Sequence, residues 1–455
     1  MKPIFVISCP IDTYSGYGSR SRDIAKAVIE LDKYDVRIIP QRWGDTPWDF
    51  IKNNPNWGFL EKHLFYPNPE EKHPQPDIWV QVTIPNEYQP LGKFSIGVTA
   101  GIETTIAPAD WIEGCNRMNL VLGSSKHTID VFKHSKWTKN DEKGQPVGNI
   151  ELTADTEVLF EGVNTKIYNP VSSILDLSGV KEQFAFLFVG HWLQGDLGHD
   201  RKNIGLLIKL FCETFKDKHK QPALILKTSH GGASYMDRDN TLRKIKMVKD
   251  TIKGKLPKIY LLHGEFTDDE MNELYNHSKV RAMVSLTKGE GFGRPLLEFT
   301  QTKKPILATN WSGHIDFLKP DMSTLIGGSL GNVHGSAANK WAIKESQWFD
   351  VNQEEVSRYL KMMFKKPNLF RDNAKKQGYY CKTNFSFEKM KEKLGEILEE
   401  KMKSIPQQVS LNLPKLKKTG GAPQTLKLPK LKKIGEENNN EPPKIKLPKL
   451  KKIEA

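Results

Sequence analysis

Short apolar segments alternate with amphipathic segments along most of the chain, and this alternation restricts the fold more than any other feature. The first apolar segments that we expect to form buried strands are residues 3–8, 35–39, 78–82, 94–98 and 119–122. Residues 19–31 and 126–133 have the periodicity of helices. Strand, helix and strand in succession are typical of a parallel sheet that is covered by helices.

A second series of the same kind begins near residue 184. Its expected strands are residues 184–189, 223–227, 258–262, 280–286 and 305–308, and its expected helices are residues 204–215, 240–251, 268–277 and 295–302. We therefore predict two doubly wound α/β halves, joined near residues 161–180, where Gly, Asn, Pro and Ser cluster. Ligands bind at the carboxyl ends of the strands in such folds, so we expect a cleft there. Residues 352–403 are expected to be helical.

The end of the chain has a different composition. Of the net charge of +14, residues 404–455 contribute +8, from 12 Lys and 4 Glu. The sequence LPKLKK occurs three times, at residues 413–418, 428–433 and 447–452. Proline recurs too often for a helix and each apolar patch is small, so we predict a disordered tail. Two interpretations are open: a solubilising tail, or multivalent attachment to a polyanion or to an acidic protein groove.

Composition also bears on the cellular environment. The sequence has no run of 18 apolar residues, so we expect no membrane-spanning helix. The apolar stretch at the N-terminus is too short for a signal peptide, and we expect it to be the first strand. The four cysteines are far apart and lack metal-ligand spacing, which favours a reducing compartment. We expect a cytoplasmic protein, with peripheral attachment at a membrane surface as a further option.

Residues 288–298 read KGEGFGRPLLE and lie between an expected strand and an expected helix. Gly291 and Gly293 would let backbone amides approach a ligand, and a helix N-terminus favours phosphate. The carboxylate of Glu290 could accept hydrogen bonds from sugar hydroxyls, and that of Glu298 could bind a diol such as ribose. The alternative is a tight strand–helix turn that carries two solvated glutamates.

Residues 290–298 resemble the Glu-x7-Glu signature of retaining glycosyltransferases of the GT-B fold, and most of all those of family four. Residues 263–271, 304–309 and 312–317 are similar to the same family. The resemblance extends over most of the first 400 residues. It implies an α/β fold with two Rossmann-like, doubly wound domains that face a cleft.

The implied organisation has four parts. Residues 1–170 would form an N-terminal Rossmann-like acceptor domain, and residues 171–385 a C-terminal Rossmann-like domain that binds the nucleotide-sugar donor. Residues 386–403 are expected to form an amphipathic helix that packs back on the N-terminal domain. Residues 404–455 are the Lys-rich tail.

The resemblance also assigns roles to the residues of the motif. Glu290 would contact the donor sugar, and Glu298 would hold the ribose. The loop amides at Gly291, Phe292 and Gly293 would contact the sugar or the phosphates.

A basic pair that binds the diphosphate is implied as well. Lys202 matches the phosphate-binding lysine and would neutralise charge on the leaving diphosphate. The chain has His191 where many members of the family have arginine. Either Arg201 replaces that arginine, or a neutral imidazole hydrogen-bonds to the donor instead.

The first glycine loop, with Gly16 and Gly18, ends the first expected strand and opens the first helix. A dinucleotide-binding fingerprint is disfavoured, because Ser21 takes the place of its third glycine and no acid ends the next strand. The resemblance places this loop and Glu103 at the cleft. Gly16 and Gly18 would approach the donor diphosphate or the acceptor. Glu103 would orient the acceptor hydroxyl or the donor sugar, or else it caps a turn.

We predict no metal site and no cofactor, because the nucleotide sugar is a substrate. Asp237 and Asp239 match the Asp-x-Asp motif of metal-dependent glycosyltransferases, but that motif belongs to another fold and directly follows a strand. Here we expect Asp239 to cap a helix. Four tryptophans could line an acceptor surface or pack in cores and loops: Trp43, Trp48, Trp57 and Trp79.

The sequence as a whole predicts a hexosyl- or pentosyltransferase. By resemblance it would move a sugar from a nucleotide diphosphate sugar to an acceptor hydroxyl with retention, and the acceptor would be a saccharide or a glycan-lipid. The catalytic residues would be Glu290, Glu103 and Lys202. Two alternatives stay open: transfer to a hydroxymethylated base in DNA, and a catalytically inactive GT-B scaffold.

Overall fold

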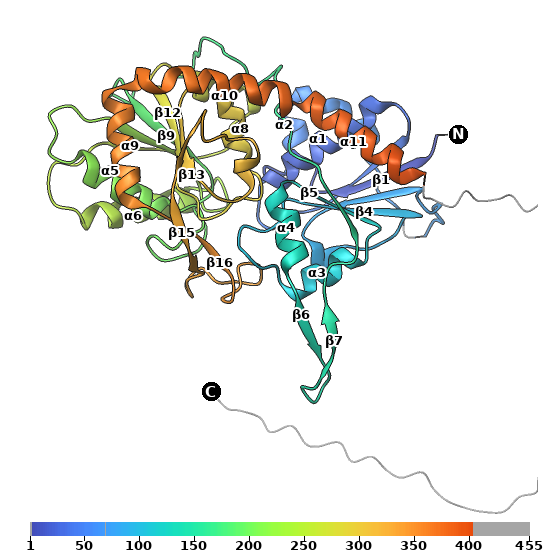
Figure 1. Cartoon of the computed structure of the whole chain (residues 1–455). Coiled ribbons are helices and arrows are strands. Elements are labelled where there is room, and N and C mark those ends of the chain that lie inside the picture. Colours follow the sequence, from blue (N-terminus) through green and yellow to red (C-terminus); the bar gives the residue numbers. More distant parts are fainter. Residues whose placement is uncertain (1, 69, 404–455) are drawn as a thin grey trace, which may run out of the picture. The chain divides into compact units, whose positions relative to one another are not determined.

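The computed structural model describes residues 2–68 and 70–403 (Figure 1). The N-terminal half contains a sheet of six parallel strands in the order β2-β1-β3-β4-β5-β8. These strands are β1 (Ile4–Cys9), β2 (Asp35–Pro40), β3 (Ile78–Val82), β4 (Phe94–Thr99), β5 (Leu120–Gly123) and β8 (Asp155–Val158). Phe5 and Ile7 of β1 belong to the core on one face of the sheet, whereas Val6 belongs to the core on the other. Both faces of the sheet are therefore covered.

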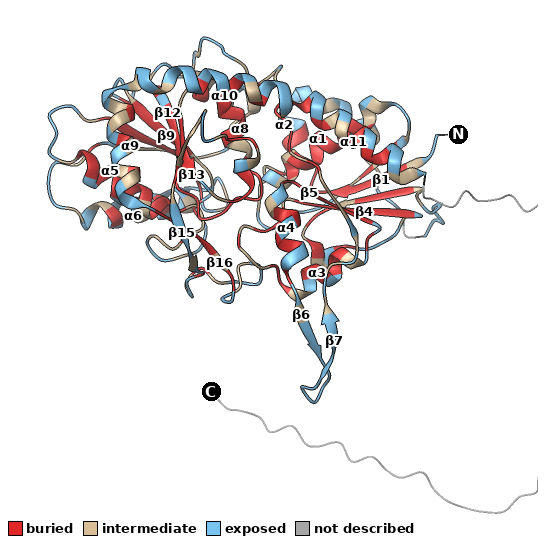
Figure 2. Cartoon of the chain, in the orientation of Figure 1, coloured by how far each residue is buried: buried red, intermediate tan, exposed pale blue. Residues whose placement is uncertain are grey.

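The C-terminal half contains a second sheet of six parallel strands, in the order β11-β10-β9-β12-β13-β14. These strands are β9 (Ala185–Val189), β10 (Ala223–Lys227), β11 (Ile259–Leu262), β12 (Val280–Ser285), β13 (Ile306–Thr309) and β14 (Thr324–Ile326). This order, in which the third strand is at one edge and the sixth at the other, is that of a Rossmann fold. Figure 2 shows the central strands as buried. The predicted pair of doubly wound α/β halves is confirmed.

Helices surround the two sheets. In the N-terminal half they are α1 (Gly16–Leu31), α2 (Phe50–Asn53), α3 (Ala109–Asn116) and α4 (Lys126–His134). In the C-terminal half they are α5 (Ile204–Phe215), α6 (Tyr235–Asp250), α7 (Asp268–Asn276), α8 (Arg294–Thr300), α9 (Gln353–Lys365) and α10 (Arg371–Asn384).

The last helix, α11 (Phe387–Met402), returns to the N-terminal half and lies along α1 (Figure 1). Its apolar face joins the N-terminal core through Phe387, Met390 and Leu394. Lys391 Nζ also donates to Glu30 Oε2 at 2.7 Å. The two halves are thus linked by the chain at residues 161–180 and again by this helix.

The structure contains elements that the apolar pattern did not reveal. The edge strands β8 and β14 are short, and β8 carries mostly polar side chains, so neither gives an apolar run. Two antiparallel hairpins are also present: β6 (Trp137–Asn140) with β7 (Pro146–Ile150), and β15 (Gly328–Asn332) with β16 (Gln347–Val351).

Helix α6 begins earlier than expected. Ser234 caps it, because its side chain accepts a hydrogen bond from Asp237 N at 3.1 Å. The prediction that Asp239 is the cap was therefore wrong. Asp239 lies within the first turns of the helix instead.

The predictions for the tail, residues 404–455 with their three LPKLKK repeats, lie outside the described residues. In the part of the chain that the structure describes, no helix has the length and apolar character needed to cross a membrane. All four cysteines are buried as free thiols.

Candidate functional site

A cleft of about 810 Å³ is lined by loops at the carboxyl ends of strands from both sheets. From the N-terminal half, lining residues after β1, β2, β3 and β4 include Gly16, Arg42, Glu87 and Glu103. From the C-terminal half, lining residues at or after the ends of β9, β10, β11 and β12 include Lys202, Lys227, Glu265 and Glu290. This is the edge at which doubly wound sheets bind ligands, so the cleft lies where the sequence predicts it.

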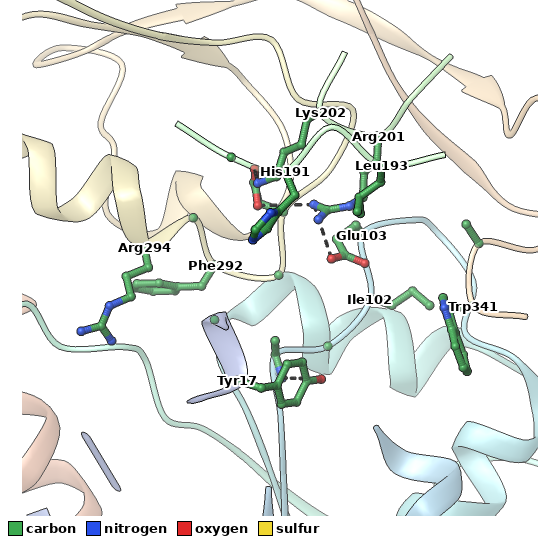
Figure 3. Close-up of a pocket in the computed structure, with 18 of the residues that line it drawn as sticks. Tyr17, Ile102, Glu103, His191, Leu193, Arg201, Lys202, Phe292, Arg294 and Trp341 are labelled. Atoms are coloured by element: carbon green, nitrogen blue, oxygen red, sulfur yellow. Dashed lines mark hydrogen bonds and ion pairs between the residues drawn. The ribbon is translucent and has the colours of Figure 1, made fainter. Parts of the chain in front are cut away.

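Four of the predicted site residues form one chain of alternating charges in the cleft (Figure 3). Lys202 Nζ donates a hydrogen bond to Glu290 Oε1. Arg201 Nη1 lies 3.5 Å from Glu290 Oε2 and 3.4 Å from Glu103 Oε1. Glu103 follows β4 of the N-terminal half, whereas the other three belong to the C-terminal half. We refer to these four residues as the charge chain.

Glu290 is held tightly and remains ionised. Its side chain is 9% exposed, its backbone N–H donates to Ser312 Oγ at 2.9 Å, and its carbonyl accepts from Gly313 N at 2.9 Å. Burial by itself would raise the pKa of Glu290, but the charges of Lys202 and Arg201 outweigh burial and lower it to about 2. A carboxylate with so low a pKa is a poor general base at neutral pH. It is suited to accepting hydrogen bonds and to stabilising positive charge.

The C-terminal side of the cleft carries more cations than anions. Besides Arg201 and Lys202, Lys227 at the end of β10 lines it and donates to Gly264 O at 2.6 Å. Desolvation in the cleft, together with the charges of Lys202 and Lys227, lowers the pKa of His191 to about 4, so the imidazole is neutral at physiological pH. Such a cluster suits a multiply charged anion, for example a diphosphate.

The sequence analysis did not single out Lys227. Lys227 could have been predicted from its place at the carboxyl end of an otherwise apolar strand. That edge of the sheet is where ligands bind in this fold.

Close packing against the N-terminal half explains why glycines occur in the loop between β12 and α8. A Cβ at Gly291 would lie 2.2 Å from Ala100 O, and one at Gly289 would lie 1.9 Å from Glu103 O. Gly293 caps α8 with a φ of +94°, a backbone conformation that favours glycine. The loop after β12 therefore packs directly on the backbone of the N-terminal half. The sequence analysis explained Gly291 and Gly293 by ligand approach alone and did not consider Gly289.

Of the other residues predicted to contact the donor, Gly16 and Phe292 line the cleft and Gly18 does not. Gly16 opens α1 and lines the cleft, with open space where a side chain would project. Gly18 does not line it, and a Cβ there would lie 2.3 Å from Thr13 O. Gly18 thus serves the turn that precedes α1. Phe292 lines the cleft, and its ring packs on Phe317 with centroids 5.0 Å apart.

Glu298 is not among the residues that line the cleft. Its buried carboxylate accepts hydrogen bonds from Arg294 Nε at 2.8 Å and from Tyr275 Oη at 3.2 Å. Arg294 does line the cleft, and it also pairs with Asp23 of α1. The predicted contact between Glu298 and a ribose would require this carboxylate to exchange its present partners.

The burial of Glu298 leads to a prediction about pH. Burial raises its pKa from 4.5 to about 7, although Arg294 favours the ionised form. Between these values the folded protein binds more protons than the unfolded chain. The free energy of unfolding should therefore fall as pH rises through this range, by up to about 3 kcal/mol. Glu298→Gln, which does not titrate, should lose this pH dependence in urea unfolding. An identical pH dependence in the variant and the wild type would contradict the prediction.

The Asp-x-Asp residues are engaged in local contacts. Asp237 accepts a hydrogen bond from His230 N and lies 2.7 Å from His263 Nε2, and Asp239 pairs with Arg238. Among residues 2–68 and 70–403, no group of three or more His, Cys, Asp or Glu side chains could hold a metal ion.

No protein-family model matches the sequence, and no curated protein matches it. Solved structures do match. Sucrose-phosphate synthase from Thermosynechococcus elongatus superposes with a TM-score of 0.59 at 12% identity, over 89% of this chain and 100% of that one. A glycosyltransferase from Rickettsia africae gives 0.56 at 16% identity, over 89% and 99%. Anabaena HepE in complex with UDP and glucose gives 0.55 at 13% identity, over 88% and 100%. These similarities confirm the predicted GT-B fold, and at such identities they establish the fold alone.

Proposed function

We propose that the protein transfers a sugar from a nucleoside diphosphate sugar to an acceptor hydroxyl, with retention of configuration. The observation that carries the proposal is the charge chain, which lies at the carboxyl edges of two Rossmann-like sheets. The similarity to HepE, solved with UDP and glucose, supports a nucleotide sugar as the donor. Retention rests on the resemblance of residues 290–298 to the Glu-x7-Glu signature.

In this proposal the diphosphate occupies the cationic side of the cleft. Lys202 moves from Glu290 to the phosphates and neutralises the charge that builds as the bond between the anomeric carbon and the diphosphate oxygen breaks. Glu290, then free of Lys202, accepts hydrogen bonds from sugar hydroxyls and faces the positive charge on the anomeric carbon. Arg201, which lies 3.5 Å from Glu290 Oε2, stays beside the carboxylate and favours its ionised form.

Glu103 approaches the same point from the N-terminal half, and we assign to it the orientation of the acceptor hydroxyl. The new bond joins the anomeric carbon to the acceptor oxygen. The proton of the acceptor hydroxyl passes to the departing diphosphate. We propose a saccharide or a glycan-lipid as the acceptor.

The proposed function is tested by incubating the purified chain with a panel of UDP-, GDP- and ADP-sugars and measuring release of the free nucleotide. We expect release from at least one donor. Lack of release from every donor by a folded protein, with and without acceptors, would support an inactive scaffold instead. Sugar transfer to a hydroxymethylated DNA duplex, with no turnover on any glycan, would support the DNA alternative.

We also propose that the LPKLKK repeats at residues 413–418, 428–433 and 447–452 bind a polyanion or an acidic protein and take no part in catalysis. Among residues 2–68 and 70–403, the last one that lines the cleft is Trp348. A chain truncated after Lys403 should therefore keep kcat and KM on a small acceptor within about twofold of the full chain. Loss of activity on truncation would show that the tail takes part in catalysis.

A further inference from the structure

Aromatic side chains line the part of the cleft that the charge chain leaves free. Tyr17, in the first turn of α1, stacks on Trp43 with ring centroids 4.0 Å apart and planes inclined by 23°. The ring of Tyr17 is fixed, because its hydroxyl lies 2.9 Å from Thr99 Oγ1 and accepts a hydrogen bond from Ala100 N. The pair therefore presents a rigid aromatic surface. Of the four tryptophans considered in the sequence, Trp43 alone lines the cleft.

A second aromatic surface comes from the C-terminal half. Trp341 lies in the loop between β15 and β16, lines the cleft and is 39% exposed (Figure 3). Its ring centroid is 6.3 Å from that of Trp111, a buried residue of α3. Nothing in the sequence pattern marked Trp341, because it lies in a loop with no periodicity.

The loop that carries Trp341 is braced on two sides. Val333, Ala337 and Trp348 form a small core of its own. The ring of His334 stacks on that of His199, with centroids 3.9 Å apart.

The N-terminal half holds the same hairpin in place. Thr105 N donates to Gln347 O at 2.9 Å, and Gln347 N donates to Thr105 Oγ1 at 2.9 Å. Trp341 is thus held against the N-terminal half by a supported loop.

Polar groups beside the aromatic rings indicate the class of ligand. Glu87, Glu103, Arg42 and Asn339 line the same cleft. In the described part of the chain, the indole N–H groups of Trp43 and Trp341 donate no hydrogen bond to the protein. A pyranose has an apolar face of C–H groups, which suits an aromatic surface, and a rim of hydroxyls, which suits carboxylates, amides and N–H donors.

Charge argues against a nucleic-acid acceptor at this part of the cleft. The N-terminal half contributes three carboxylates, Glu87, Glu103 and Glu161, and one cation, Arg42. A nucleic-acid strand would bring a row of phosphates past these carboxylates, and like charges repel. A neutral sugar ring meets no such repulsion.

We propose that Tyr17, Trp43 and Trp341 form the acceptor subsite, and that this subsite binds a neutral saccharide ring by stacking. The inference rests on the proposed glycosyl transfer and adds to it the residues that bind the acceptor and the neutral charge of the sugar ring that they bind. The bound ring would place a hydroxyl near Glu103 and the charge chain.

The test uses the full chain and the donor that it turns over. The candidate acceptors are methyl glucoside, methyl galactoside, maltose, lactose and octyl glucoside, the last standing for a lipid-linked sugar. A single-stranded oligonucleotide with hydroxymethylcytosine is the nucleic-acid arm. Nucleotide release without acceptor tests the proposed function, and stimulation of release by each acceptor tests the subsite.

We expect at least one saccharide to stimulate release. Trp341→Ala and Trp43→Ala should each raise the KM for that saccharide about tenfold, because each removes one stacking surface. Trp341→Phe, which keeps a ring, should raise it by less than about threefold. Tyr66→Ala is the matched control, because Tyr66 is 71% exposed and does not line the cleft.

Three outcomes would overturn the proposal while leaving the donor chemistry intact. The first is stimulation by the oligonucleotide and by no saccharide. The second is an unchanged saccharide KM in both alanine variants. The third is release of nucleotide from the donor with no stimulation by any saccharide of the panel. Titration of each variant with the free nucleotide shows that it is folded.

Discussion

Replacing Glu290 with glutamine is expected to lower kcat by about 10²–10³-fold, the range observed when one electrostatic group is removed from a preorganised site. Glutamine keeps the size of the side chain but removes the charge that faces the anomeric carbon. In the folded protein this carboxylate competes with the donor phosphates for Lys202, since Lys202 Nζ already donates to it. Affinity for the free nucleoside diphosphate should therefore stay the same or increase.

The combination of low kcat and undiminished nucleotide affinity is the specific signature of this role. Glu113→Gln is the matched control, because Glu113 lies outside the cleft in an exposed pair with Lys139. A Glu290→Gln variant that turns over at the wild-type rate would show that the carboxylate does not act in transfer. A variant that loses nucleotide affinity along with kcat would indicate a collapsed site.

Replacing Lys202 with methionine is expected to lower kcat/KM by about 10²–10³-fold, because the leaving diphosphate loses the cation that neutralises it. Unlike the Glu290 variant, this one should also bind nucleoside diphosphates more weakly. Methionine has a similar length, but it leaves the buried Glu290 with Arg201 as its remaining ion-pair partner. Some loss of stability is therefore expected as well.

Thermal unfolding separates the two effects of the lysine change. Assays well below the Tm of the variant report on catalysis alone. Lys209→Met is the matched control, because Lys209 lies on the exposed side of α5, away from the cleft. Equal losses of kcat/KM in the two lysine variants would refute a phosphate role for Lys202.

Much of the fold could be predicted from the sequence because its central strands are apolar runs. Residues 185–188 and 223–226, for example, are buried on both faces and give continuous apolar segments. The edge strands β8 and β14 could not be predicted, since an edge strand needs few apolar side chains. The hairpin of β15 and β16 was missed because β15 (GSLGN) consists mostly of small and polar residues, and β16 (QWFDV) has no long apolar run.

The charged residues of the candidate site could be predicted from the sequence, but the positions of other residues relative to the cleft could not. Glu290 and Lys202 stand out by sequence context, and the structure brings them into contact with each other. The sequence did not predict that Glu298 lies outside the lining of the cleft. Arg294, four residues before it, donates a hydrogen bond to its carboxylate. Trp341 was not predictable either, because its place in the cleft depends on how a distant hairpin packs against the N-terminal half.

The most direct test is a calorimetric titration with nucleoside diphosphates and monophosphates of the same base, on the wild type and on Lys202→Met. If Lys202 binds the second phosphate, the wild type should bind the diphosphate about 10–100-fold more tightly than the monophosphate. In Lys202→Met this ratio should fall to within about threefold of unity. An undiminished ratio in the variant, or no binding of any nucleoside diphosphate to the folded wild type, would contradict the proposed donor site.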